Sequence, residues 1–262
     1  MTSITSTVRD TNTMLRRNLV HLRRYPSLTA MIVGMPVVFL LLFVYVFGDV
    51  MGTGLAGAEA GRTEYLDFLT PGMLVLTLAA AAQGVAILVA RDKEEGIMAR
   101  FRTMDIARSS ILSAHVLGNL FQTAIACVLF LALATALGYR PTASVAGWFT
   151  VIGLLILANI ALSWLSVALG MAAASVETAS NTPMPLLLLP FFGSGFVPVD
   201  SMPLGLRWFA QYQPFTPLID SVRGLLAGET LGNELWLAVG WCVAIALIGY
   251  LWARRLFEKM SH

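Results

Sequence analysis

Few residues in this sequence have the types and spacing that catalysis needs. The histidines are His21, His115 and His262, and both cysteines, Cys127 and Cys242, lie inside apolar runs. Because no His-x-x-x-His or Cys-x-x-Cys spacing occurs, the sequence predicts neither a metal site nor a disulfide framework. A phosphate-binding loop is also missing, since neither of the two lysines follows a glycine. We therefore expect no catalytic residue, metal or cofactor on this chain.

One pairing suggests a nucleophile and its base, namely Ser194, within Gly193-Ser194-Gly195, and His115. Such a pair would be that of an intramembrane serine protease. The two residues are expected near opposite ends of different membrane spans, well beyond hydrogen-bond reach. We therefore interpret the two glycines as close-packing or bend residues.

Polar residues recur at helical spacing inside two apolar runs, which puts each set on one helix face. They are His115, Asn119 and Gln122 in the first run and Asn159, Ser163 and Ser166 in the second. In hydrocarbon such faces turn inward, because unsatisfied polar groups are costly there. Two interpretations stay open. The residues either form interhelical hydrogen bonds, worth about 0.6 to 2 kcal/mol each, or line a substrate path together with Gln83.

The elements that carry these residues are apolar spans. Of the 262 residues, 57% are hydrophobic and 12% are charged, whereas an ordinary soluble domain carries about 25% charged residues. This composition excludes a soluble enzyme and predicts an all-α, polytopic membrane protein forming one domain, residues 1–262, with six transmembrane helices. The continuous runs are about 27–47, 68–90, 111–137, 147–174 and 235–252. Another run, from Pro183 to Pro198, is interrupted by prolines and glycines, so we expect a short crossing surrounded by protein.

The distribution of lysine and arginine predicts the orientation. Of the 17 such residues, five precede residue 26, five lie in 91–110 and three follow residue 252. By the positive-inside rule, both termini and the loop between spans two and three are therefore cytoplasmic. Residues 8–26 combine arginines with leucines at helical spacing, which is typical of an amphipathic helix at a membrane surface. A disordered basic leader is the alternative.

The cytoplasmic loop over 91–109 has the pattern of a helix that binds a partner. Arg91 and Glu95 can pair at i, i+4, and Ile97, Met98 and Phe101 form an apolar edge. Such an edge can enter a groove on a cytoplasmic protein. An ordinary solvated loop is the alternative.

Residues 199–228 are too interrupted by proline to cross a membrane. We expect two short helices that start at Pro203 and Pro217, because proline suits the first helical turn. The expected caps are Asp200 or Ser201 for the first helix and Thr216 for the second. In the second helix, Asp220 and Arg223 can pair at i, i+3.

Two separated segments of the chain resemble type-2 ABC transporter permeases. Arg-Asp-Lys-Glu-Glu-Gly at 91–96, then Arg-Phe-Arg-Thr at 100–103 and Ser109, is similar to the family signature (R)EKEEGTLERLRTTP…S. The stretch SGFVPVDSMP at 194–203, followed by Trp208, Pro214, Pro217, Asp220, Arg223 and Gly224, resembles the family's SG.FFPL..LP..L..…NPLTY.VDALR. The chain departs from the first signature at Ile97-Met98-Ala99 and Met104-Asp105. Within the family it most resembles the daunorubicin/doxorubicin-resistance exporters.

The resemblance implies a permease subunit in a bacterial cell membrane, without an ATPase site of its own. Two permeases, as a homodimer or a heterodimer, would pair and export hydrophobic or amphipathic drug-like molecules or lipids. Two cytoplasmic ATP-binding subunits would bind ATP and Mg²⁺ and dock on the loop over 91–109, the coupling helix. We expect membrane lipids, but no nucleic acid, as further partners.

The resemblance also implies roles for individual residues. ATPase coupling is assigned to Glu94, Glu95, Gly96, Met98, Arg100, Phe101 and Arg102. A re-entrant helix pair over 199–228 would shape an outer gate with Phe196, Pro198, Asp200, Pro203, Pro214, Pro217, Asp220 and Arg223.

The alternative function is an ion-gradient-driven secondary transporter. Against it, no Asp, Glu, Lys or Arg lies in the middle of a continuous apolar run to carry protons.

Overall fold

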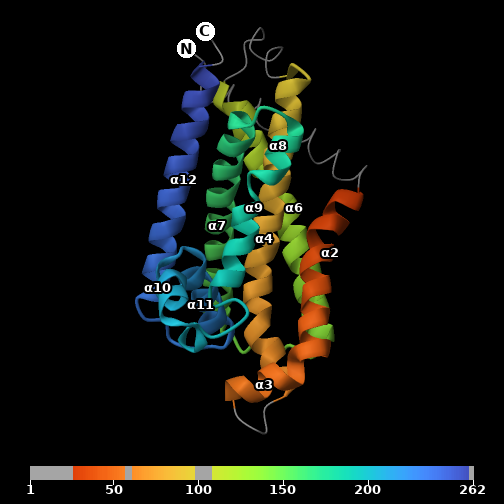
Figure 1. Ribbon diagram of the computed structural model, residues 1–262, viewed down its shortest axis with the longest axis vertical. Helices are drawn as coiled ribbons and strands as arrows, with labels where there is room; N and C mark the ends of the chain where they lie inside the picture. The colour runs from red at the N-terminus through yellow and green to blue at the C-terminus, as the bar shows by residue number, and fades with distance from the viewer. Residues whose placement is uncertain (1–25, 57–60, 98–107, 260–262) are drawn as a thin grey trace.

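The computed structural model describes residues 26–56, 61–97 and 108–259, and the regular elements of these residues are all helical. Five of the helices are long and apolar enough to cross a membrane. They are residues 32–54 near the N-terminus, α4 (Arg62–Glu94), α6 (Arg108–Ala136), α7 (Val145–Ala172) and α12 (Glu234–Lys259). In Figure 1 these helices lie side by side along the long axis. The predicted amphipathic helix over 8–26 lies outside the described residues, apart from Pro26.

The first crossing consists of three consecutive helices. It runs through α2 (Pro26–Leu42), the π-helical turn η1 (Phe43–Phe47) and α3 (Gly48–Ala56). Its first two parts cover the predicted span at 27–47. Figure 1 shows α3 turning sideways at the far end of α2, across the beginning of α4, which it contacts.

The predicted broken crossing is a series of short helices rather than one span. It contains α8 (Val176–Asn181), α9 (Met184–Leu188) and the 3-10 helix η2 (Leu189–Phe192). Proline prevents a continuous helix here because it lacks the N–H donor that the ladder requires. The series runs along α4, with α8 near the last turn of α4 and η2 near its beginning (Figure 1). We call these two ends of the bundle the Glu94 end and the Arg223 end.

At the Arg223 end the chain forms η3 (Val199–Ser201), α10 (Leu204–Tyr212) and α11 (Phe215–Leu226). The expected first helix follows Pro203 as predicted. The second starts earlier than predicted, at Phe215, which puts Pro217 inside its first turn. The expected caps are wrong, since neither helix has a side-chain cap hydrogen bond and Asp200 pairs with Arg207 instead.

The centre of the bundle is α4. Of its most apolar window, 72% is buried, against 22% for the first crossing and 17% for α12, so the latter two present most of their surface outward. Close contact between α4 and α7 depends on Gly170, where a Cβ atom would lie 2.5 Å from the Ala86 carbonyl oxygen. Small residues of this kind let membrane helices approach closely.

Several helices are longer than their apolar runs. Helix α4 continues to Glu94, into the segment predicted as the coupling loop, and α12 continues to Lys259. Hydropathy marks only the part of a helix that lies in hydrocarbon, whereas charged turns can continue the helix into water. Here i, i+4 pairs support those turns, Arg91 with Glu95 and Arg254 with Glu258.

Candidate functional site

At the Glu94 end, the last turn of α4 contacts two other long helices through charged side chains. The Asp92 Oδ2 atom lies 3.2 Å from His115 Nε2 on α6, and both residues are buried. Lys93 Nζ donates hydrogen bonds to the carbonyl oxygens of Met171 and Ala173, both at 2.9 Å. Met171 and Ala173 lie at the C-terminal end of α7, where helix carbonyls lack partners within the helix. The end of α4 is therefore bound to both α6 and α7.

The next residues of α4 differ in their surroundings, although the sequence grouped them together. The carboxylate of Glu94 accepts a hydrogen bond of 2.8 Å from the backbone N–H of Val176, the first residue of α8. The carboxylate of Glu95 instead pairs with Arg91 at 3.1 Å, which confirms the predicted i, i+4 contact. Gly96 has φ of +68°, a conformation that glycine adopts without strain, and it ends the helix.

The other residues predicted to couple to an ATPase, Met98, Arg100, Phe101 and Arg102, lie outside the described residues. Their role stays a prediction. The exposed surface next to them in the described chain is formed by Glu94 and Glu95.

Inside the bundle, the two predicted polar faces meet each other across the contact between α6 and α7. Asn119 Nδ2 donates to Ser163 Oγ at 2.9 Å, and Asn159 Nδ2 donates to Thr123 Oγ1 at 2.8 Å. Ser163 Oγ also lies within hydrogen-bond distance, 3.4 Å, of Asn159 Oδ1. All four side chains are buried. This arrangement favours the interpretation that these residues hold helices together.

The remaining polar residues of the predicted path are dispersed. Gln83 Nε2 donates to the backbone carbonyl of Ser180 on α8 at 2.7 Å. Gln122 and Ser166 are buried, and the Ser166 hydroxyl has no hydrogen-bond partner among the described residues. His115 belongs to the contact with α4 at the Glu94 end. The structure therefore divides Gln83, His115 and the asparagines among three different contacts.

At the Arg223 end, one arginine joins three segments that are distant in sequence. Arg223 pairs with Asp220 at 2.6 Å, as the spacing predicted. Its guanidinium also donates to the carbonyl oxygens of Phe68 on α4, at 3.3 Å, and of Ser194. The same group lies over the Phe68 ring, 4.0 Å from the centroid, which is a cation–π contact. The sequence suggested the carboxylate partner but gave no signal for the two carbonyls.

Phe196 lies beside this arginine cluster in an aromatic group. Its ring stacks on Phe191 with centroids 4.1 Å apart and lies 5.2 Å from the Phe43 ring of the first crossing. The Tyr65 hydroxyl of α4 donates to the Phe196 carbonyl at 3.3 Å. Of the residues predicted for the outer gate, Phe196 and Arg223 therefore contact the first turns of α4, and Asp220 binds Arg223.

The other predicted gate residues shape the short helices. Pro198 and Pro203 precede η3 and α10, and Pro214 precedes α11, which contains Pro217. Asp200 binds Arg207 of α10 in an exposed ion pair.

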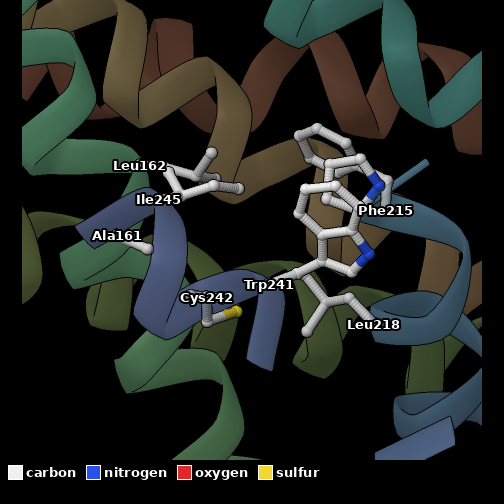
Figure 2. A pocket seen from close by; sticks show the side chains of 9 residues that line it. Ala161, Leu162, Phe215, Leu218, Trp241, Cys242 and Ile245 are labelled. Atoms are coloured by element: carbon white, nitrogen blue, oxygen red, sulfur yellow. The ribbon is translucent and has the colours of Figure 1, made fainter. Parts of the chain in front are cut away.

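A small apolar pocket, partly open to the surroundings, lies where α7, α11 and α12 meet (Figure 2). Its lining residues are Ala158, Ala161, Leu162, Pro214, Phe215, Leu218, Trp241, Cys242 and Ile245. None of these side chains carries a charge, so the pocket suits an apolar group. Within the described ranges, no cluster of three or more His, Cys, Asp or Glu residues could hold a metal ion.

A bundle of apolar helices, with charged contacts at both ends and proline-rich short helices at one of them, defines a polytopic α-helical membrane protein. Comparison with known protein families identifies the family to which this membrane protein belongs. The family model of the ABC-2 type transporter matches residues 9–227, and the chain belongs to this family.

Two of its relatives are named as permeases of ABC transporters. The daunorubicin resistance ABC transporter permease protein DrrB1 of Streptomyces coeruleorubidus is 29% identical over 243 residues, 92% of this chain and 82% of that protein. The probable doxorubicin resistance ABC transporter permease protein DrrC of Mycobacterium tuberculosis is 25% identical, over 94% of this chain and 88% of that protein. Nodulation protein J of Rhizobium leguminosarum bv. trifolii is 25% identical, with 79% of each chain covered.

Proposed function

We propose that this protein is the membrane-spanning permease subunit of an ATP-driven exporter of hydrophobic or amphipathic small molecules, drug-like compounds or lipids. The observation that supports the proposal most is the similarity to a daunorubicin resistance permease over 92% of the chain. Two permeases would pair, and two separate subunits would bind ATP and Mg²⁺. This chain would contribute the path through the membrane.

In the proposed arrangement the Glu94 end is cytoplasmic and the Arg223 end faces outward. The series α8–α9–η2 would be the fifth of six crossings, supported by its course along α4 (Figure 1). Helices α10 and α11 contain 9 and 12 residues, too few for the roughly 20 that cross a hydrocarbon core. They would form a re-entrant pair in the outer leaflet.

The coupling step would begin at the exposed end of α4. ATP binding would close the two ATPases, and that movement would reach the permease at Glu95, Gly96 and the residues that follow. Because α4 is central in the bundle and contacts α6, α7 and α8, a displacement of its end changes the positions of several crossings together. Such small shifts of packed helices are a common way to convert one membrane-protein state to another.

The outer gate would be closed in the state described here. Arg223 holds the turn at Ser194 against α4, and the stacked rings of Phe191 and Phe196 fill the space beside it. Opening the gate requires these contacts to separate. An apolar group released from the path would meet aromatic and aliphatic side chains at this end.

A secondary transporter remains the second candidate, and one observation favours it. Asp92 and His115 form a buried carboxylate–imidazole pair, the type of group that carries protons in gradient-driven transporters. The pair lies in the last turn of α4 rather than in the middle of a span, which argues against a transmembrane proton route.

The two functions are separated by reconstituting the chain with its ATP-binding subunit in inverted vesicles. We expect accumulation of an apolar fluorescent drug that needs ATP, that stops when the catalytic glutamate of the ATPase is replaced by Gln, and that persists with a protonophore. Accumulation that does not require ATP and that stops when the protonophore is added would instead establish the secondary transporter.

A further inference from the structure

Adjacent residues of α4 bind the two helix ends at the junction of α7 and α8. Helix α7 ends at Ala172 and α8 begins at Val176, so the chain changes direction over 173–175. Lys93 donates to two carbonyl oxygens at the end of α7, and Glu94 accepts from the first N–H of α8. The charges match the helix ends, because a helix is partly negative at its C-terminus and partly positive at its N-terminus.

Helix α8 is bound to α4 at its other end as well. Gln83, about three turns earlier on α4, donates to the Ser180 carbonyl. Between these two contacts, Ala90 of α4 packs in a small buried cluster with Ala173 and Ala179, and Val176 lies against it. Small side chains at this contact let the two helices approach closely. Helix α8 is therefore held along its length on α4.

From these contacts we propose that Lys93 and Glu94 form an internal clip, which makes the α7–α8 junction move with the end of α4. The inference rests on the proposed function and deepens it. Both glutamates are exposed. Glu94 is then a positioning residue whose carboxylate binds another helix of the permease, whereas the carboxylate of Glu95 bonds only within α4 and is the one assigned to contact with an ATPase. The sequence resemblance assigned one role to both glutamates.

The clip lies at the beginning of a connection between the two ends of the bundle. The chain that starts at Val176 runs along α4 to Ser194, whose carbonyl Arg223 holds at the other end. A movement applied to the end of α4 at Glu95 and Gly96 is thereby passed to the start of this chain. The outer cluster around Arg223 lies at its far end.

The test reverses the clip without changing composition or net charge. The clip variant carries Lys93→Glu and Glu94→Lys, so that each helix end meets a charge of its own sign. The matched control carries Arg254→Glu and Glu258→Arg, which reverses an exposed i, i+4 pair on α12 at the same end of the bundle. A conservative variant, Lys93→Arg with Glu94→Asp, keeps both signs.

The first readout needs no transport activity. Ala179, which is fully buried against α4, is replaced by Cys in a background with Cys127→Ser and Cys242→Ala, and its reaction with a maleimide is timed. We expect the clip variant to raise the labelling rate about tenfold, because α8 leaves α4 more often. The control and the conservative variant should keep the parent rate. An unchanged rate in the clip variant, or an equal rise in the control, would overturn the proposal.

The second readout is the ratio of cargo moved to ATP hydrolysed by the reconstituted complex. The clip variant should still assemble with the ATPase and hydrolyse ATP but move several-fold less cargo per ATP, and the conservative variant should restore the ratio. A proportional loss of both activities would contradict a role in transmission. If the parent complex itself shows no ATP-dependent transport, the proposed function fails, and the labelling rates alone decide on the clip.

Discussion

At the residue scale, Arg223 shows how one side chain can hold together segments that hydropathy treats separately. The sequence predicts its partner Asp220 because both lie on one helical turn. It cannot predict the carbonyl oxygens of Phe68 and Ser194, because any residue supplies a carbonyl and only the fold brings these two together. Arginine suits the position since its planar guanidinium donates in several directions at once.

Replacing Arg223 by Met should lower the free energy of unfolding by about 2 to 4 kcal/mol, because Asp220 and two carbonyls lose a charged donor. Denaturant unfolding in mixed micelles measures the change. The control is Arg207→Met, which breaks an exposed pair with Asp200 and should cost about 0 to 1 kcal/mol. Equal losses for the two variants would show that the Arg223 contacts add nothing to stability.

Asn159 tests the two interpretations of the polar faces. Asn159→Leu removes the hydrogen bond to Thr123 across the contact between α6 and α7, so we expect a loss of about 1 to 2 kcal/mol in unfolding free energy and the same cargo range. Thr150→Leu on the same helix is the control, because that hydroxyl bonds the Ala146 carbonyl of its own helix. A variant with unchanged stability and an altered cargo range would place Asn159 on the substrate path instead.

At the element scale, the existence of the long helices follows from composition, whereas their ends and contacts do not. The apolar runs predict where α4, α6, α7 and α12 lie, and the prolines predict that the run after Pro183 is broken. The extension of α4 to Glu94 was missed because its last turn is charged. The predicted start of α11 at Pro217 was wrong because Pro214 also satisfies the rule for a helix start, and sequence alone does not choose between them.

In the candidate sites, the sequence likewise predicted the contacts within one helix but not those between helices. Spacing along one helix gave Arg91 with Glu95 and Asp220 with Arg223, since both pairs are local. The contacts of Lys93 and Glu94 with α7 and α8 join residues about 80 positions apart, and nothing in the sequence indicates such partners. Local rules therefore find ion pairs within a helix, while contacts between helices need the fold.

The close contact between α4 and α7 predicts that a larger side chain at Gly170 destabilises the protein. Gly170→Ala should lower the free energy of unfolding by about 1 to 3 kcal/mol, because its Cβ would lie 2.5 Å from the Ala86 carbonyl and the helices must separate. Gly153→Ala, also on α7, is the matched control. Its Cβ meets open space, so alanine should be neutral or stabilising by up to about 1 kcal/mol. Unfolding of both variants in the same micelles decides the point, and a neutral Gly170→Ala would refute the close contact.

At the scale of the whole molecule, the chain between α7 and α12 decides the topology. If residues 176–192 cross the membrane, the Glu94 end and the Arg223 end lie on opposite sides, and α12 returns the chain to its starting side. In the described structure Glu94 binds the start of the series and Arg223 binds the turn that follows it, so the series extends from one end of the bundle to the other. The basic segments, rather than these two contacts, predict which side is cytoplasmic.

Two single-cysteine variants test this topology in intact cells, again in a background with Cys127→Ser and Cys242→Ala. Glu177→Cys lies on the exposed face of α8 near the Glu94 end, and Thr230→Cys lies in the exposed loop before α12. We expect a membrane-impermeant maleimide to label position 230 directly and position 177 only after permeabilisation, because the broken crossing separates them. Labelling of both positions from outside would mean that residues 176–192 do not cross, and labelling of position 177 alone would invert the orientation.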